Sequence, residues 1–315
     1  MAWLEVNMKK YNDKELGKLI KNALGYKTLV RPPLYWLDTR SYKLNSVLGS
    51  KKLGLAYGKI YLIAGKETSG KSALAAKLAG LAQKDGADVA WVDGEGSFDG
   101  DHVRRQGLHP SKVELFYPEY GEFKVFDGKQ KKKLGLEEVE PAEYLFERVE
   151  MWMKLKRHKN KKGRLFVVVD STNSFSPKEE QAAGFKDQNM RTRSSPAVFL
   201  NMVTKRFGQL AVHTNAIVVL ISQLRTNPAK MFGNPDYIPG GGGMKYFPSS
   251  IVWMRRVKDG AVFQDGQQIG VKGLLTNTKN KVGGGSIERK KCGYQAYFYK
   301  DDWKFVSASE IKGEA

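Results

Sequence analysis

The chain has 315 residues, 41% of them hydrophobic, which suffices for one large domain or two modest ones with a buried core. Its 53 Lys and Arg residues exceed its 33 Asp and Glu residues, and the net charge of +20 suits a polyanion, either nucleic acid or an anionic membrane surface. The lone Cys292 excludes an intrachain disulfide and fits a reducing compartment, and the absence of a signal core or a long apolar run predicts a soluble cytoplasmic protein. A membrane-surface role is disfavoured because no basic helix pattern has a strong apolar face.

The first 45 residues form a separate N-terminal element in this reading. Leu16, Leu19, Ile20 and Leu24 recur at helical spacing, which predicts a helix over 13–24. One short helix before the RPP stretch cannot build its own core, so it must pack on the main domain or on a neighbouring subunit. We therefore divide the chain into an N-terminal helix and linker, 1–45, and a core, 46–315.

From residue 58 onward, strand and helix patterns alternate. We expect strands at 59–64, 89–92, 165–170 and 215–222 and helices at 72–83, 141–157 and 197–210. The strands LFVVVD and NAIVVLIS are apolar on both faces, as central strands of a parallel sheet are. The alternation predicts an α/β domain with a mostly parallel central sheet flanked by helices. The three segments SSIVWMRRV, GLLTNTKNKV and YQAYFYK predict strands at the sheet edge, and 118–140 predicts a loop or insertion.

The segment GKETSGKS matches the phosphate-loop pattern G-x-x-x-x-G-K-[ST] in full, and it leaves a predicted strand to enter a predicted helix. The expected ATP-binding residues are Gly65, Lys66, Glu67, Thr68, Ser69, Gly70, Lys71 and Ser72. Backbone N–H groups and the helix N-terminus would face the phosphates, Lys71 would reach the β- and γ-phosphates, and Ser72 would bind Mg²⁺. Lys66 is not required by the pattern, and the alternative for it is a solvated loop residue.

Carboxylates follow two of the predicted strands. Asp170 ends LFVVVD, where a carboxylate beside the phosphate loop would help to hold Mg²⁺; the alternative is a cap of the next turn. Glu95 follows VAWVD and could activate the water that attacks the γ-phosphate, but Asp93 competes for this role and position alone does not separate them.

Between about residues 50 and 300 the chain resembles the RecA-type recombinases. GKETSGKS resembles their phosphate loop, VDGEGSFDGDHVRRQGL the segment with their catalytic glutamate, VVVDSTNSFSPKEE their Walker B strand, and NTKNK their Lys-x-Lys segment. The most specific piece is MFGNP followed by a glycine cluster, an aromatic residue and an arginine pair. The resemblance implies a RecA-like P-loop NTPase core.

The resemblance also implies roles for single residues. Glu95 would be catalytic, Gln223 would sense the γ-phosphate, and Lys279 and Lys281 would reach the γ-phosphate of the next subunit. Two DNA-binding loops would span about 182–193 and 224–243. Their expected DNA contacts are Lys186, Arg191, Arg193, Arg225, Lys230, Met231, Phe232, Gly240, Gly241, Gly242, Gly243 and Lys245. A flexible surface linker is the alternative for the glycine run.

Two positions depart from the family pattern. His102 stands where an aromatic ring usually stacks on adenine, which puts nucleotide affinity or base selectivity in question. Ser222 stands where Asn usually precedes the sensor glutamine, and we expect little consequence because a hydroxyl can still bond locally.

The resemblance implies a DNA-dependent ATPase that uses ATP and Mg²⁺ and forms a helical filament on single-stranded DNA. It would pair that strand with homologous duplex DNA in recombination and repair, in a bacterial cytoplasm or a phage-infected cell, with a single-strand-binding protein or loader as a further partner. One alternative is a hexameric RecA-fold helicase, which usually uses an arginine finger and which the Lys279–Lys281 segment disfavours. Another is a weakly hydrolysing paralogue that acts as a DNA-binding mediator, although Glu95, Gln223 and the lysine pair are all present.

Overall fold

The computed structural model describes residues 35–121, 124–127, 130–133, 138–183, 189–230, 232–282, 290–297 and 302–311. The helix predicted over 13–24 lies outside these residues. Contacts divide the chain after Leu34, and Tyr35–Ala315 form one compact unit. Residues 35–45, which the sequence analysis groups with the N-terminal element, therefore lie within the larger unit, where Leu37 and Leu44 are buried in its core.

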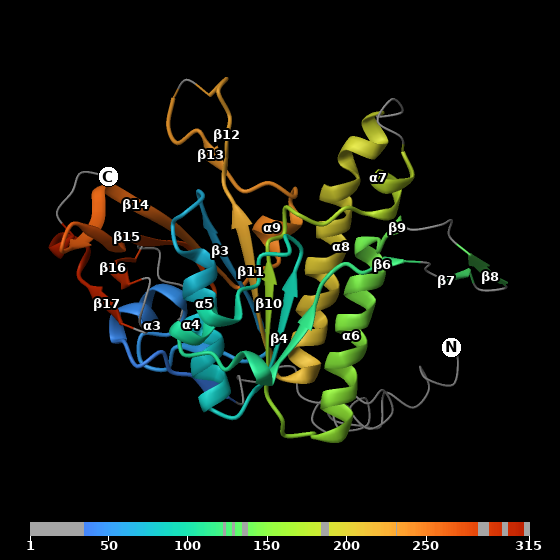
Figure 1. The fold of residues 1–315 in the computed structure, drawn as a ribbon, viewed down its shortest axis with the longest axis horizontal. Helices are drawn as coiled ribbons and strands as arrows, with labels where there is room; N and C mark the ends of the chain where they lie inside the picture. Colours follow the sequence, from blue (N-terminus) through green and yellow to red (C-terminus); the bar gives the residue numbers. More distant parts are fainter. Residues whose placement is uncertain are drawn as a thin grey trace, which may run out of the picture. The chain divides into compact units, whose positions relative to one another are not determined.

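A nine-stranded sheet forms the centre of this unit, in the order β17-β16-β15-β14-β3-β11-β10-β4-β5 (Figure 1). Six neighbouring strands are parallel: β14 (Ser250–Gln264), β3 (Lys59–Gly65), β11 (Ala216–Gln223), β10 (Leu165–Asp170), β4 (Asp88–Asp93) and β5 (Val113–Phe116). The antiparallel strands are β15 (Gln267–Asn280), β16 (Lys291–Tyr297) and β17 (Trp303–Val306). The predicted parallel centre is thus confirmed. The three C-terminal segments form strands as predicted, but they are β14, β15 and β16, which lie inside the sheet, and β17 forms its edge.

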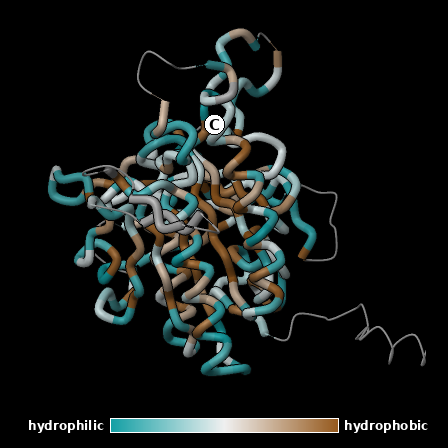
Figure 2. Tube along the Cα trace, turned by 90° about the vertical axis from the view of Figure 1, so that its right-hand side faces the viewer, coloured by the Kyte–Doolittle hydropathy of each residue, from teal (hydrophilic) through white to brown (hydrophobic). Residues whose placement is uncertain are grey.

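Helices cover both faces of the sheet. On one face lie α3 (Tyr42–Leu48), α4 (Lys71–Lys84) and α5 (Gly100–Arg105), and on the other α6 (Ala142–Lys159) and α8 (Met190–Thr214) (Figure 1). Strand side chains alternate between the two cores, so Tyr61 and Ile63 pack toward α4 while Ile60 and Leu62 pack toward α6 and α8. Figure 2 shows the resulting hydrophobic interior.

Helix α8 begins at Met190, before the predicted start at 197. Asn189 caps it, since the Thr192 N–H donates to Asn189 Oδ1 at 3.1 Å and the Asn189 N–H donates to Thr192 Oγ1 at 2.9 Å. The reciprocal cap stabilises a first turn that precedes Pro196. Residues 190–193 of the predicted first DNA loop are therefore helical.

The remaining elements are short. They are β1 (Trp36–Leu37) paired with β2 (Leu55–Ala56), β6 (Tyr120–Gly121) with β9 (Glu138–Val139), β7 (Lys124–Asp127) with β8 (Gln130–Lys133), β12 (Arg225–Thr226) with β13 (Asp236–Tyr237), α7 (Lys178–Ala182), α9 (Gly243–Tyr246), and the 3₁₀ turns η1 (Pro110–Lys112) and η2 (Ala308–Glu310). The segment 118–140, predicted as a loop or insertion, contains two small antiparallel ladders. Among the described helices, none is long and apolar enough to cross a membrane.

Candidate functional site

The phosphate-loop segment joins β3 to α4 at the carboxyl end of the parallel strands. Gly65 has no room for a side chain, because a Cβ there would lie 2.5 Å from the Met254 carbonyl oxygen and 2.6 Å from Ser69 Oγ. Gly70 adopts the left-handed φ of +88° directly before α4 and gives that helix no side-chain cap. The first N–H groups of α4 are therefore left for an anion, as in phosphate-binding loops.

Lys71 lies across this loop. Its Nζ donates to the carbonyl oxygen of Lys66 at 2.7 Å, and Ser69 Oγ donates to the same oxygen at 2.8 Å. Burial lowers the pKa of Lys71, while the carboxylates of Asp170 and Glu95 act in the opposite direction. Lys71 and Ser69 thus donate to a backbone carbonyl of the loop itself. A bound phosphate would accept hydrogen bonds from these groups in its place.

Asp170, the last residue of β10, lies near the start of α4, although β11 separates β10 from β3 in the sheet. Burial raises the pKa of its carboxyl group to about 6, with Glu95 and Asp93 adding to the rise, while a hydrogen bond from the Ser72 hydroxyl and the charge of Lys71 oppose it. A hydroxyl and a carboxylate oxygen are the ligands that Mg²⁺ prefers, and a cation between them would relieve the cost of the buried charge. Ser72 and Asp170 therefore fit a magnesium ion.

Asp93 and Glu95, the two candidates for the general base, have different surroundings. The buried carboxylate of Asp93 accepts hydrogen bonds from the N–H groups of Glu95 at 3.1 Å and Phe98 at 2.8 Å, so it holds the turn after β4. Glu95 is exposed, and its Oε1 accepts a 2.6 Å hydrogen bond from Ser171 Oγ. Of the two carboxylates, that of Glu95 is the more accessible to a water molecule.

Gln223 ends β11 directly beside the phosphate loop, opposite Gly65 in the strand register. Asn173 holds this strand end, because its Oδ1 accepts the Gln223 N–H at 3.1 Å and the Ser222 hydroxyl at 3.2 Å. Ser222 thus makes a local hydrogen bond. The end of β11 therefore lies beside the phosphate loop, and the chain continues from it directly into β12.

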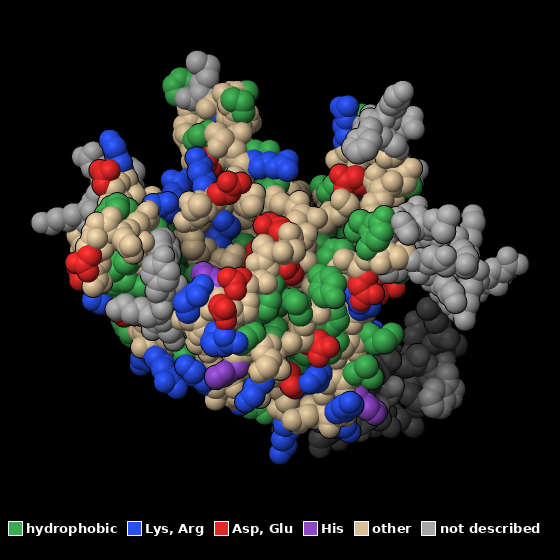
Figure 3. Space-filling view, in the orientation of Figure 1, with side chains coloured by type: hydrophobic (Ala, Val, Ile, Leu, Met, Phe, Trp, Pro, Cys, Tyr) green, Lys and Arg blue, Asp and Glu red, His purple; other side chains and the backbone are tan. Residues whose placement is uncertain are grey.

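The β12–β13 hairpin rises from this strand end (Figure 1). Arg225, Lys230 and Phe232 are exposed on it, with Phe232 86% accessible. Figure 3 shows Lys and Arg side chains gathered around the base of the hairpin. An exposed aromatic ring among cationic side chains is typical of surfaces that bind single-stranded nucleic acid.

The glycine run that follows the hairpin packs against helix α8. A Cβ at Gly240, whose φ is +92°, would lie 2.7 Å from Leu200 Cδ1, and one at Gly243 would lie 2.6 Å from Asn201 Oδ1. Gly241 also has a positive φ, and Gly242 is the N-cap residue of α9. The close approach to α8 gives these positions a structural reason to be glycine.

Comparison with known proteins identifies the family. The sequence model of the RecA N-terminal domain matches residues 3–127 and 157–290, more than half of the chain. This chain belongs to the RecA family. It is 27% identical to the protein named RecA of Malacoplasma penetrans over 90% of this chain and 76% of that protein. It is also 27% identical to RecA of Desulfotalea psychrophila and 28% identical to RecA of Mycoplasma pneumoniae, covering 85% and 78% of this chain and 66% and 63% of those proteins.

Other residues singled out from the RecA resemblance lie apart from the phosphate loop. Lys279 Nζ donates to the carbonyl oxygens of Lys245 at 2.8 Å and Tyr246 at 2.7 Å, at the end of α9, and burial lowers its pKa to about 8. Lys279 of β15 pairs with Ile251 of β14, which in turn pairs with Leu62 of β3. Lys279 therefore lies two strands, or about 10 Å, across the sheet and three residues, or about 10 Å, along it from Gly65. Lys279 and the adjoining Lys281 are therefore not brought to the phosphate loop of their own chain.

The remaining predicted residues are placed as follows. His102 is half-buried on α5, which packs against α4, and burial lowers its pKa. Arg193 is exposed in the first turn of α8, and Lys245 is exposed on α9. Lys186, Met231 and the side chain of Arg191 lie outside the described residues.

The structure brings to the phosphate loop three residues for which the sequence predicts no role. Tyr294 Oη donates to the Ser69 carbonyl oxygen at 2.8 Å, and Arg256 Nη1 donates to Thr68 Oγ1 at 3.3 Å. Trp303 lies 3.9 Å from a Cβ built at Gly70. Arg256 belongs to the arginine pair quoted for the resemblance, whereas nothing local in the sequence marks Tyr294 or Trp303, because long-range strand pairing brings them to the loop.

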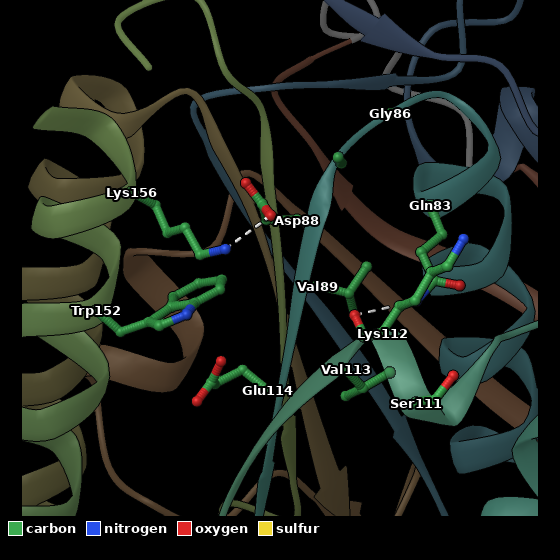
Figure 4. Close-up of a pocket in the computed structure, with 11 residues that line it drawn as sticks. Gln83, Gly86, Asp88, Val89, Ser111, Lys112, Val113, Glu114, Trp152 and Lys156 are labelled. Atoms are coloured by element: carbon green, nitrogen blue, oxygen red, sulfur yellow. Dashed lines mark hydrogen bonds and ion pairs between the residues drawn. The ribbon is translucent and has the colours of Figure 1, made fainter. Parts of the chain in front are cut away.

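A pocket of about 470 Å³ lies at the opposite end of the sheet, where β4 and β5 begin (Figure 4). Trp152 and the ion pair between Lys156 and Asp88, 2.8 Å long, contribute to its lining, and none of the predicted site residues does. Ligands of open α/β sheets bind at the carboxyl ends of the strands, so the candidate site is the one built around the phosphate loop.

Proposed function

We propose that this member of the RecA family is an ATP- and Mg²⁺-dependent DNA recombinase that forms a helical filament on single-stranded DNA and pairs it with homologous duplex DNA. The observation that carries the proposal is the position of Gln223. This residue stands opposite Gly65 of the phosphate loop and two positions before Arg225 of the exposed hairpin. A nucleotide site and a nucleic-acid surface therefore share one strand end.

Each group in the site has a role in this proposal. The N–H groups at the start of α4 and Lys71 hold the phosphates, and Ser72 and Asp170 hold Mg²⁺. ATP supplies the terminal phosphate that is hydrolysed. Glu95, accessible and oriented by Ser171, takes a proton from the attacking water, and Gln223 links the nucleotide site to the hairpin.

The cationic side chains around the hairpin bind DNA phosphates, and Phe232 stacks on bases. Arg193 is a further DNA contact in this proposal, as are Lys186, Arg191 and Met231, whose side chains lie outside the described residues. Lys279 and Lys281 serve the phosphate of a neighbouring subunit, where they neutralise charge as an arginine finger does. This requires Lys279 to exchange the carbonyl oxygens at the end of α9 for that phosphate. We also propose that the protein acts in the cytoplasm and that a single-strand-binding protein or a loader is a further partner.

Negative-stain microscopy with single-stranded DNA, with and without a non-hydrolysable ATP analogue, tests the proposal. We expect helical filaments that require the analogue and that are lost in Lys71→Met. The control variant Lys43→Met should retain them, because it removes only an exposed lysine of α3 that pairs with Glu310. Closed rings would favour a helicase, and the absence of any assembly would favour a weakly hydrolysing DNA-binding paralogue.

A further inference from the structure

Asp236, the first residue of β13, connects the hairpin to two other elements. Its carboxylate is only 10% exposed and lies 3.5 Å from Lys66 Nζ, on the phosphate loop, and 3.4 Å from Arg255 Nη2, on β14. The Thr226 hydroxyl, on β12, donates to the same carboxylate at 2.9 Å. We call Lys66, Asp236 and Arg255 the clasp.

The phosphate loop and the hairpin are thus held from the same strand. Arg255 contacts Asp236 of the hairpin, and the next residue, Arg256, contacts Thr68 of the phosphate loop. Lys66 closes the connection directly, although the phosphate-loop pattern does not require a lysine at its position. The pairing with Asp236 gives Lys66 a role other than that of a solvated loop residue.

The two cations of the clasp differ in freedom. Arg255 is anchored over the ring of Trp253, 5.3 Å from its centroid, whereas the side chain of Lys66 is 65% exposed. Lys66 can therefore turn away at little cost. A phosphate arriving at the loop is a second anion within reach of the Lys66 ammonium group, and it competes with Asp236 for that charge.

We propose that the clasp is a nucleotide-sensitive restraint on the hairpin 225–237. Without nucleotide, Lys66 pairs with Asp236 and ties the hairpin to the phosphate loop. Phosphates at the loop draw Lys66 away and free the hairpin from the phosphate loop for single-stranded DNA, while Arg255 still links Asp236 to β14. Asp236 is a positioning residue, since it acts through Lys66 and not on the reacting atoms. The inference rests on the proposed function, because it takes the hairpin to bind DNA.

The test compares Asp236→Asn, Lys66→Met and the double variant with the unmodified protein. The quantity measured is the ratio of single-stranded DNA affinity with a non-hydrolysable ATP analogue to that without it, at saturating analogue. Charge removal alone would raise DNA affinity in the aspartate variant and lower it in the lysine variant, in both nucleotide states equally. The ratio cancels these changes and isolates the coupling between the two sites.

We expect both single variants to reduce the ratio by about fivefold, a typical size for coupling between two sites, and the double variant to reduce it no further. Lys43→Met, which breaks an exposed ion pair elsewhere, should keep the ratio of the unmodified protein. An unchanged ratio in either single variant, or a further additive loss in the double variant, would overturn the clasp.

A second measurement needs no DNA. In nucleotide-free protein, trypsin should cut after the exposed Lys230 about fivefold faster in both single variants, because the released hairpin opens more often. Equal cleavage rates would also count against the clasp. If the unmodified protein does not bind single-stranded DNA at all, the proposed function itself fails, whereas normal binding with an unaltered ratio in the variants refutes the clasp alone.

Discussion

Replacing Asp170 with Asn should make the ligand-free protein more stable at neutral pH. The buried carboxyl group has its pKa raised from 3.8 to about 6, so keeping it ionised in the folded state costs about 3 kcal/mol. Asn removes this charge and retains an oxygen that can accept the hydrogen bond from Ser72. At pH 7 and above, the free energy of unfolding should therefore rise by up to about 3 kcal/mol.

The pH dependence of the stability difference between Asp170→Asn and the unmodified protein follows from the direction of this pKa shift. Because the folded-state pKa lies above the unfolded one, the folded protein binds more protons between pH 3.8 and about 6, and its stability falls as the pH rises through this window. The advantage of Asp170→Asn should thus be absent below pH 4 and complete above pH 6. Urea unfolding curves from pH 4 to 8, without Mg²⁺ or nucleotide, measure it. The exposed Asp101→Asn on α5 serves as the control and should follow the unmodified protein.

The reasoning would be refuted if Asp170→Asn changed stability by the same amount at every pH, because the effect would then come from packing and not from a buried charge. The same variant should lose the stabilisation that Mg²⁺ and an ATP analogue give together. Stability gained at the expense of ligand binding is typical of groups held for function.

Three further predictions concern other parts of the molecule. Glu95→Gln should retain ATP-analogue and DNA binding while ATP hydrolysis falls by about 100-fold or more, and unchanged hydrolysis would shift the role of general base to Asp93. Gly80→Ala should lower the free energy of unfolding by about 1–3 kcal/mol, because its Cβ would lie 2.5 Å from the Gly107 carbonyl oxygen. Gly208→Ala, where the nearest atom is 3.6 Å away, should instead raise it by about 0.5–1 kcal/mol, and denaturant unfolding that ranked the two helix variants the other way would contradict the packing of α4. Affinity for single-stranded DNA should fall with salt at a log–log slope of about −0.7 per neutralised phosphate, and a flat response in a filter-binding titration would remove the electrostatic contribution.

Much of the core could be predicted because its signals are local. The run LFVVVD is apolar on both faces, which indicates a central parallel strand, and it forms β10 between β4 and β11. The phosphate-loop segment carries its own conformational requirement, since Gly70 must adopt a positive φ before α4. Helix α8 begins before the predicted start at 197, because the reciprocal cap of Asn189 and Thr192 stabilises a turn that precedes Pro196.

The glycine run shows where local reasoning reaches its limit. From the sequence, the resemblance places the four consecutive glycines in a DNA-binding loop, and a flexible surface linker is the alternative. In the structure, Gly240 and Gly243 lie against Leu200 and Asn201 of α8, and this contact accounts for the missing side chains. The partner helix lies about 40 residues earlier in the chain, so no nearby residue reveals the contact.

The sequence by itself determined the α/β class, the phosphate loop and the carboxylates at the strand ends, because period, glycine placement and charge act over a few residues. Only the tertiary structure determined which side chains contact one another around the phosphate loop. It assigned the Asp93 carboxylate to backbone amides and left Glu95 accessible, and it brought Tyr294 to the phosphate loop. It also set Lys66 against Asp236, which lies 170 residues further along the chain. The register of a folded sheet determines these distances, and that register depends on all of its strands together.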